Sequence, residues 1–129
     1  MLKTVLIAAC LAAVATPGWA QATVAKGTAG RDYLQAPSGM TLYVFDGDRT
    51  TGGTPSASTC YDQCAKNWPA FTADQGAQPK ADWSVLDRKD GAKQWAYKGR
   101  PLYTFVRDKT AGQQEGDAFN GNRWHVAVP

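Results

Sequence analysis

The chain contains one aromatic pattern twice, and this repetition limits the folds available to it. The first copy reads TLYVFDGD at residues 41–48 and the second reads PLYTFVRD at residues 101–108, and both spell Tyr-x-Phe-x-x-Asp. At an offset of 60, seven positions of a 14-residue window are identical, namely Gly39, Leu42, Tyr43, Phe45, Asp48, Thr50 and Gly52 with Gly99, Leu102, Tyr103, Phe105, Asp108, Thr110 and Gly112. The sequence therefore predicts one fold unit built twice.

The first 20 residues have the three-part pattern of a secretory signal peptide. Lys3 precedes an apolar run over residues 4–14, which is too short to span a bilayer, and small residues follow. We expect cleavage near Ala20 and export to the periplasm or the medium. An alternative stays open, because IAAC ending at Cys10 has the spacing of a lipidation box, which would leave a lipid-anchored protein.

Residues 21–32 are small and polar and predict a flexible lead-in, and residues 33–129 predict a single duplicated domain with halves at about 33–70 and 83–129. Without Lys3 the exported chain holds 13 Lys and Arg against 11 Asp and Glu, spread along its length. This balance argues against nucleic-acid binding. No other stretch approaches membrane length, so we expect no transmembrane segment in the mature chain.

The local patterns predict a mainly β, antiparallel fold with one short helix that carries a disulfide. Apolar residues alternate in TLYVFD, and WSVLDR and QWAYKG flank an Asp90-Gly91 step that suits a hairpin turn. The segment STCYDQCAKNWP predicts a helix capped by Thr59 and ended by Pro69.

Cys60 and Cys64 are the two cysteines outside the leader, so in an oxidising compartment they predict a disulfide. Their i,i+4 spacing on an ideal helix is wider than a disulfide prefers, so the turn must tighten or fray. Metal ligation and a thiol-redox role stay open as alternatives, although the spacing C-x-x-x-C is not that of the usual redox motif.

The segments GMTLYVFDGD, CYDQCAKNWPAF, DGAKQWAYKGRPLYTFVRD and WHVAVP resemble those of a bacterial repeat family, secreted or lipoprotein-type, with a Tyr-x-[Phe/Trp/Tyr]-x-x-Asp motif. The similarity runs from about Tyr33 to Pro129. It implies export and a duplicated, mostly β domain. The family is a secreted repeat of unknown function, so the resemblance implies no activity.

The motif residues predict structure rather than catalysis. Paired carboxylates can perform acid–base chemistry, but acid and base need different surroundings, whereas Asp48 and Asp108 occupy repeated positions. We expect each to close a loop by accepting amide hydrogen bonds. The aromatic residues of the motif are expected to share a core layer; they are Tyr43, Phe45, Tyr103 and Phe105, joined by Trp95 and Tyr97.

The tyrosine hydroxyls are expected to form hydrogen bonds with Asp48 and Asp108. In that case Tyr103→Phe and Asp108→Asn should lower the free energy of unfolding non-additively.

His125 is the only histidine of the chain, so a hydrolytic triad cannot be argued. We predict no enzyme and no cofactor, but an exported binding or accessory module of the cell envelope, with a protein or small-molecule partner. The alternative is a copper or thiol-redox protein that uses Cys60, Cys64, His125 and Met40. In either case the function is expected where the two halves differ, at the cysteine helix and at His125.

Overall fold

The computed structural model describes residues 23–26, 30–48, 50–51, 54–55 and 57–129. The expected signal peptide, with its cleavage site near Ala20 and the alternative lipidation site Cys10, lies outside these residues. Within them the protein is mainly β, as the sequence predicts, and all strand pairs are antiparallel.

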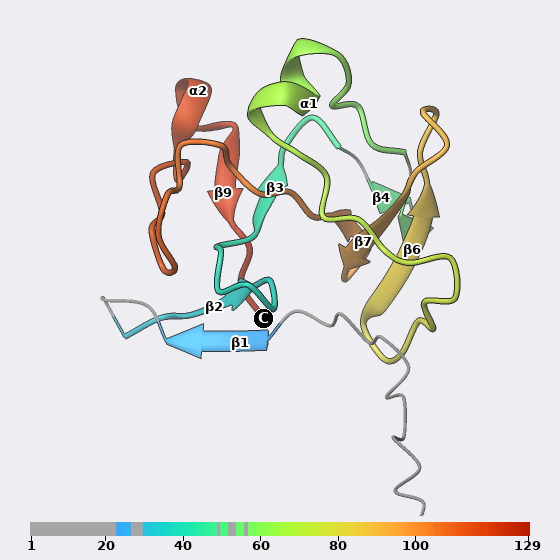
Figure 1. Ribbon diagram of the computed structural model, residues 1–129, viewed down its shortest axis with the longest axis horizontal. Helices are drawn as coiled ribbons and strands as arrows, with labels where there is room; N and C mark the ends of the chain where they lie inside the picture. Colours follow the sequence, from blue (N-terminus) through green and yellow to red (C-terminus); the bar gives the residue numbers. More distant parts are fainter. Residues whose placement is uncertain (1–22, 27–29, 49, 52–53, 56) are drawn as a thin grey trace, which may run out of the picture.

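The described strands and helices are short. They are β1 (Thr23–Lys26), β2 (Asp32–Gln35), β3 (Tyr43–Phe45), β4 (Thr50–Thr51), β5 (Thr54–Pro55), α1 (Gln63–Asn67), β6 (Trp83–Asp87), β7 (Lys93–Tyr97), β8 (Arg100–Pro101), α2 (Phe119–Asn122) and β9 (Trp124–Val126). β1 pairs with β2, β3 with β9, β4 with β5, and β6 and β8 both pair with β7. Figure 1 shows β3 and β9 side by side, with α1 and α2 near one end of this pair and the β1–β2 hairpin near the other.

The two halves interlock, because the closing segment of each half pairs with the motif strand of the other. β3 carries the first motif and pairs with β9 from the end of the chain. The second motif is paired in the same way with the end of the first half, since Thr104 N donates to Pro69 O at 2.9 Å and Phe71 N donates to Leu102 O at 2.9 Å. Each motif strand therefore pairs with the closing segment of the other half, while Leu42 N and Leu102 N, next to the tyrosines, donate to Leu34 O and Trp95 O of their own halves.

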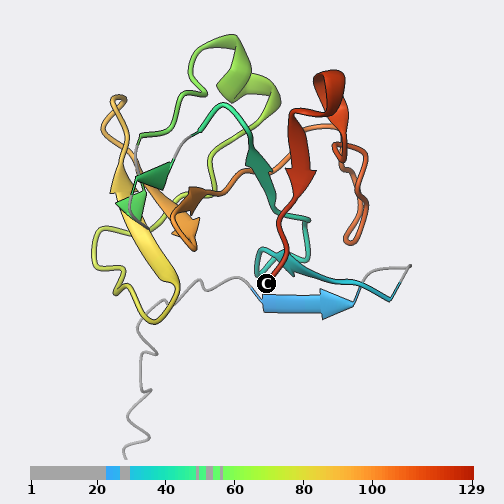
Figure 2. The same cartoon turned by 180° about the vertical axis from the view of Figure 1, so that it is seen from behind.

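A pseudo-two-fold relation between the halves passes through the two motif tyrosines. Tyr43 N donates to Tyr103 O at 2.8 Å, and Tyr103 N donates to Tyr43 O at 3.0 Å. On either side of this point β1 pairs with β2 as β6 pairs with β7. Figure 2, from behind, shows the two hairpins on different sides of the central pair. The residues Thr23–Lys26, which the composition placed in a lead-in, thus form the first strand of the first half.

The core has two clusters. One is mostly aromatic and gathers the buried residues Tyr43, Cys60, Trp68, Tyr103, Phe105 and Trp124. The other gathers the buried residues Leu34, Ala36, Leu42, Val44, Trp95, Leu102 and Ala127. The motif aromatics do share one layer, as expected. Trp95 and Tyr97 pack in the second cluster instead, so their expected place beside the motif aromatics was wrong.

Four rings from both halves form a continuous stack in the aromatic cluster. The indoles of Trp68 and Trp124 lie parallel, with centroids 3.8 Å apart. Phe105 stacks on Trp68 at 4.0 Å and Phe45 stacks on Trp124 at 4.4 Å, so each motif phenylalanine meets the tryptophan of the other half. An arginine lies over each end ring, which gives the order Arg123, Phe45, Trp124, Trp68, Phe105, Arg107. The stack buries large apolar rings at the contact between the halves.

The tyrosine and aspartate of the motif bond across the halves. The Tyr43 hydroxyl donates to Asp108 Oδ2 at 2.6 Å, and the Tyr103 hydroxyl donates to Asp48 Oδ2 at 2.5 Å. The expectation that the hydroxyls reach the aspartates is confirmed, but the expected partnership of Tyr103 with Asp108 was wrong. Because the two halves interlock, each tyrosine lies closer to the loop of the opposite half than to its own.

Each motif aspartate also anchors a loop, as predicted. Asp48 Oδ1 accepts from the backbone N–H of Thr59 at 2.8 Å and from its hydroxyl at 2.7 Å. Asp108 Oδ1 accepts from Glu115 N at 2.9 Å. Both carboxylates are 5% exposed, so their hydrogen bonds are formed away from solvent. Buried charge is tolerated only where such partners are present.

The helix predicted from Thr59 begins later, at Gln63, and a second short helix, α2, was not predicted. Thr59 is held by Asp48, Cys60 N donates to Ser58 Oγ at 3.3 Å, and Asp62 has a φ of 53°, so this turn is not helical. Cys60 therefore precedes α1, and its Cα lies 5.2 Å from that of Cys64, within the range for a disulfide.

The crossed tyrosine–aspartate pairs predict which residues are coupled in stability. In a double-mutant cycle, Tyr43→Phe with Asp108→Asn should show an interaction energy of about 1–2 kcal/mol, because each variant removes one end of the same buried, charge-assisted hydrogen bond. Tyr43→Phe with Asp48→Asn, the pair within one half, should be close to additive. Urea unfolding provides the measurement, and coupling within a half but not between halves would contradict the crossed arrangement.

The same tyrosines predict that the folded protein loses stability at alkaline pH. Burial, followed by the contact with Asp108, raises the pKa of Tyr43 above its ordinary value, and burial with the charge of Asp48 raises the pKa of Tyr103. Below about pH 10 both hydroxyls are neutral in the folded and unfolded states, and above it they ionise first in the unfolded chain. The free energy of unfolding should fall as pH rises through about 10. The Tyr43→Phe, Tyr103→Phe double variant should show a smaller fall, and an equal fall in both proteins would contradict this cause.

Candidate functional site

The motif residues do not form an open site. The carboxylates of Asp48 and Asp108 are buried and bonded to tyrosines and loop amides, and neither residue lines either of the two grooves described below. A substrate could not lie between these two groups without breaking the core. A site that is accessible to solvent must therefore be looked for at other positions, beginning with those where the halves differ.

Three equivalent positions near β9 differ sharply between the halves. The motif strands match at an offset of 60, and the closing strands match at an offset of 56, which aligns Trp68 with Trp124. The differing pairs are Asp46 with Val106, Arg100 with Met40, and His125 with Pro69. The second member of each pair has no ionisable side chain. The three ionisable side chains therefore have no counterparts at the pseudo-symmetric positions.

These three residues form one surface cluster. Asp46 Oδ2 lies 2.9 Å from His125 Nε2, and Asp46 Oδ1 lies 3.3 Å from Arg100 Nη2. The hydrogen bond from His125 is the main reason that the pKa of Asp46 lies below its ordinary value, and Arg100 adds to it. All three side chains are between one-third and one-half exposed, so the cluster is open to solvent.

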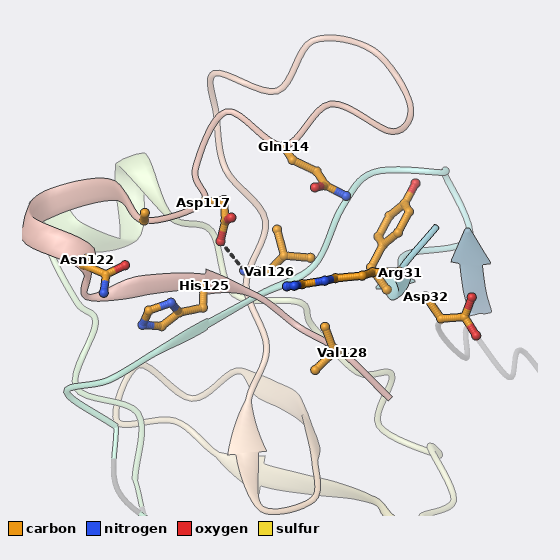
Figure 3. Close-up of a pocket in the computed structure, with 10 residues that line it drawn as sticks. Arg31, Asp32, Gln114, Asp117, Asn122, His125, Val126 and Val128 are labelled. Atoms are coloured by element: carbon orange, nitrogen blue, oxygen red, sulfur yellow. Dashed lines mark hydrogen bonds between the residues drawn. The ribbon is translucent and has the colours of Figure 1, made fainter. Parts of the chain in front are cut away.

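A groove of about 590 Å³ lies next to this cluster (Figure 3). We call it the β9 groove. Its lining comes from β2 and the residue before it, from the loop that precedes α2 and the end of α2, and from β9 and the segment after it. The lining residues are Arg31, Asp32, Tyr33, Gln114, Asp117, Ala118, Asn122, His125, Val126 and Val128. Such a volume is within the range of small-molecule and short-peptide sites.

The outer edge of β9 borders this groove. The backbone N–H and C=O of Tyr43 both form hydrogen bonds with Tyr103. Val126 is opposite Tyr43 in the β3–β9 ladder, so its own N–H and C=O point away from β3. On that side Val126 N donates to Asp117 Oδ1 at 3.2 Å, and Ala118 N donates to Trp124 O at 2.8 Å. A loop side chain thus takes the place that a neighbouring strand would occupy.

The repeated motif fixes the wall of the groove. Asp108 holds Glu115 N, and the Tyr43 hydroxyl accepts from Gly116 N at 3.3 Å. Gly116 is pressed against the core, since a Cβ at this position would lie 2.5 Å from the ring of Trp68. Because Asp117 follows directly, its position depends on the buried tyrosine–aspartate pair. This is the structural connection between the motif and the groove.

The equivalent place in the other half is filled. Tyr61 aligns with Asp117, and the guanidinium of Arg88 lies 4.5 Å from the centre of its ring. Arg88 donates to Cys60 O at 2.8 Å and to Ser58 Oγ at 3.0 Å, and Lys89 N donates to the Tyr61 hydroxyl at 3.0 Å. The β6–β7 turn therefore closes over the loop before α1, whereas the β9 groove stays open.

A second, smaller groove of about 350 Å³ lies on the other side of His125. Its lining is mostly apolar, with two cations at the edge, and consists of Val44, Tyr97, Lys98, Arg100, Leu102, His125, Val126, Ala127, Val128 and Pro129. Lys98 has a φ of 48° in the β7–β8 turn, a conformation that asparagine or glycine adopts more easily.

The residues of the copper and thiol-redox alternative are not brought together. Cys60 and Cys64 are joined in a disulfide, as their pairing predicted, and His125 is bonded to Asp46. Met40 lies in the turn before β3, where its backbone oxygen accepts from Ala36 N. Among the residues that the structure describes, no group of three or more His, Cys, Asp and Glu is placed to hold a metal ion.

The sequence patterns indicated His125 but not the rest of the groove. Arg31, Gln114 and Asp117 lie in loops or next to a strand end, and Asn122 ends the short helix α2, where neither periodicity nor a motif marks them. One signal was available, because at an offset of 56 Asp117 replaces Tyr61 and His125 replaces Pro69. Differences between the copies, rather than their identities, locate the groove.

The fold and the groove define a class of protein: a small duplicated β domain, joined across its halves by an aromatic core, with an open groove in one half. The chain belongs to the family described as a secreted repeat of unknown function, whose model matches residues 23–72 and 84–128. The two matches correspond to the two halves, and they begin at β1 and within β6. The expected family is thus confirmed, and with it a secreted class of protein.

No curated protein and no solved structure matches the chain. In the part of the chain that the structure describes, neither helix has the length and apolar character needed to cross a membrane.

The surface cluster predicts a directional pKa change. In His125→Ala, the pKa of Asp46 should rise toward its ordinary value, because the hydrogen bond from the imidazole is its main depressing cause. The rise should be incomplete, since Arg100 still contacts the carboxylate. Side-chain carboxyl chemical shifts of Asp46 followed against pH provide the measurement. A value that does not change in this variant would show that the two residues are not in contact.

Proposed function

We propose that this protein is an exported, non-enzymatic module of the cell envelope or its surroundings, which binds a ligand or partner through the β9 groove. One observation carries the proposal: a polar groove exists beside β9, while the equivalent place in the other half is filled by Arg88 and Tyr61. A duplicated fold has no structural need for such an opening in one copy. The opening also gathers ionisable and amide side chains from separate segments.

The chemistry of the groove supports binding rather than catalysis. His125 is bonded to Asp46, and the described lining includes no serine, threonine or cysteine that it could activate as a nucleophile. The lining offers a guanidinium, two side-chain amides and a backbone edge, which are groups that orient a bound molecule.

Export is part of the proposal. The leader over residues 1–20 supports cleavage near Ala20 and a location in the periplasm or the medium, and the disulfide suits an oxidising compartment. Intact mass measurement of the exported protein tests this directly. A chain that begins near Gln21 supports a soluble product, and a lipid on Cys10 would support the anchored alternative.

Binding at the groove is tested by recording amide spectra of the ¹⁵N-labelled exported protein. The panel contains short acidic, neutral and basic peptides, neutral and acidic oligosaccharides, and Cu(I) and Cu(II). At least one organic ligand should shift the amides of residues 122–126. Arg31→Gln should weaken this binding about threefold or more, because it removes an exposed charge contact.

The matched control is Lys80→Gln, which makes the same charge change at an exposed position outside both grooves. It should leave the affinity unchanged. If no organic ligand shifts the groove amides, the binding proposal fails. Saturable shifts at His125 and Met40 with copper alone would favour the metal alternative instead.

A further inference from the structure

We propose that the ligand of the β9 groove is an extended peptide that carries a carboxylate and adds as a strand to the outer edge of β9. In this arrangement a peptide group replaces Asp117 at the backbone N–H of Val126, and the peptide carboxylate binds Arg31. The inference rests on the proposed function, because it names the ligand class of the same groove.

The backbone geometry of β9 carries the first step. Tyr43 gives both of its backbone groups to Tyr103, so the N–H and C=O of Val126 are directed toward the groove rather than toward β3. An N–H and a C=O of one residue that point to the same side form the unit to which an antiparallel strand pairs. Peptides commonly bind by adding to such an edge.

Two groups of the loop before α2 now occupy this edge: Ala118 N donates to Trp124 O, and the side chain of Asp117 accepts from Val126 N. Asp117 Oδ1 accepts from Val126 N at 3.2 Å, the long end of the range for N–H···O hydrogen bonds, and Asp117 is itself exposed. An exposed carboxylate can turn to solvent at little cost in free energy. Asp117 therefore covers the edge without closing it, and it is positioned by Gly116 and Glu115 behind it.

Arg31 supplies the charge complement. In Figure 3 its guanidinium extends across the groove toward Val126, near the Asp117 contact. Arg31 is exposed, and among the described residues it has no ion pair or hydrogen bond. A carboxylate bound here would accept hydrogen bonds from the planar guanidinium while the peptide backbone meets β9.

The apolar part of the lining fits alternating side chains. Val126 and Val128 are two residues apart and line the groove together with Tyr33, and Figure 3 shows both valines near the guanidinium of Arg31. Val128 is 56% exposed, more than any other large apolar residue among those that the structure describes. A strand that pairs with this segment would cover it with its own alternate side chains.

The test uses two tetrapeptides, acetyl-Thr-Val-Thr-Glu-amide and acetyl-Thr-Val-Thr-Gln-amide, which differ in one charge. Titrations followed by amide spectra of the exported protein should shift Val126 and slow its hydrogen exchange. The glutamate peptide should bind up to about fivefold more tightly than the glutamine peptide, the range of an exposed ion pair. Arg31→Gln should remove this difference, whereas Lys98→Asn, at the second groove, should preserve it.

Asp117→Ala provides the readout that a purely structural role would not give. Removing the side chain that covers Val126 N should tighten peptide binding severalfold, whereas most substitutions in a binding site weaken it. Asp117→Asn, which keeps the shape with a weaker acceptor, should have the same sign and a smaller effect. Weaker binding in both variants, or no change at the Val126 amide, would overturn the inference.

The outcomes separate this inference from the proposed function. If an oligosaccharide shifts the groove amides in an Arg31-dependent manner and neither peptide does, the groove binds ligands but the peptide inference is wrong. If the Val126 amide shifts with protein concentration alone, the edge pairs with a second copy of the chain, which also overturns it. If nothing shifts these amides, both proposals fail.

Discussion

The crossed pairing of two tyrosines with two aspartates is the interaction on which the rest of the structure depends. Tyr43 bonds Asp108 and Tyr103 bonds Asp48, while the same tyrosines pair with each other through their backbones. Each buried carboxylate then holds the loop that leads to the tryptophan of the ring stack. Since the tyrosine contacts all join the two halves, and each aspartate that accepts one of them also holds a loop of its own half, we infer that neither half is complete by itself.

This arrangement explains why the motif recurs while the function is placed elsewhere. The buried pair needs identical chemistry on both sides of the pseudo-two-fold relation, so its residues cannot easily specialise. The loops that it anchors are exposed and free to differ. In one half the loop ends in Tyr61 under Arg88, and in the other it ends in Asp117 beside an open groove. In this chain the repeated motif therefore belongs to the scaffold, and the differences between its two copies indicate the candidate site.

Much of the fold could be predicted from the sequence, because short-range rules govern it. The duplication, the hairpin at Asp90-Gly91 and the disulfide pair follow from identities, turn chemistry and compartment. The crossed partnership could not be predicted, since it depends on how the halves interlock and not on spacing within a half. The helix start was misplaced for the same reason, because Thr59 bonds a distant aspartate rather than capping the helix. Of the groove residues, the sequence predicted only His125, because the others come from separate segments that only the folded chain brings together.

Contacts of the two tyrosine rings test this account most directly. Nuclear Overhauser measurements on the labelled protein should place the ring of Tyr43 next to Gly116, in the second half, and the ring of Tyr103 next to Ser58, in the first half. Those two cross-half contacts are the predicted result. A Tyr43 ring next to Ser58, together with a Tyr103 ring next to Gly116, would mean that each half closes on itself, and it would contradict the account.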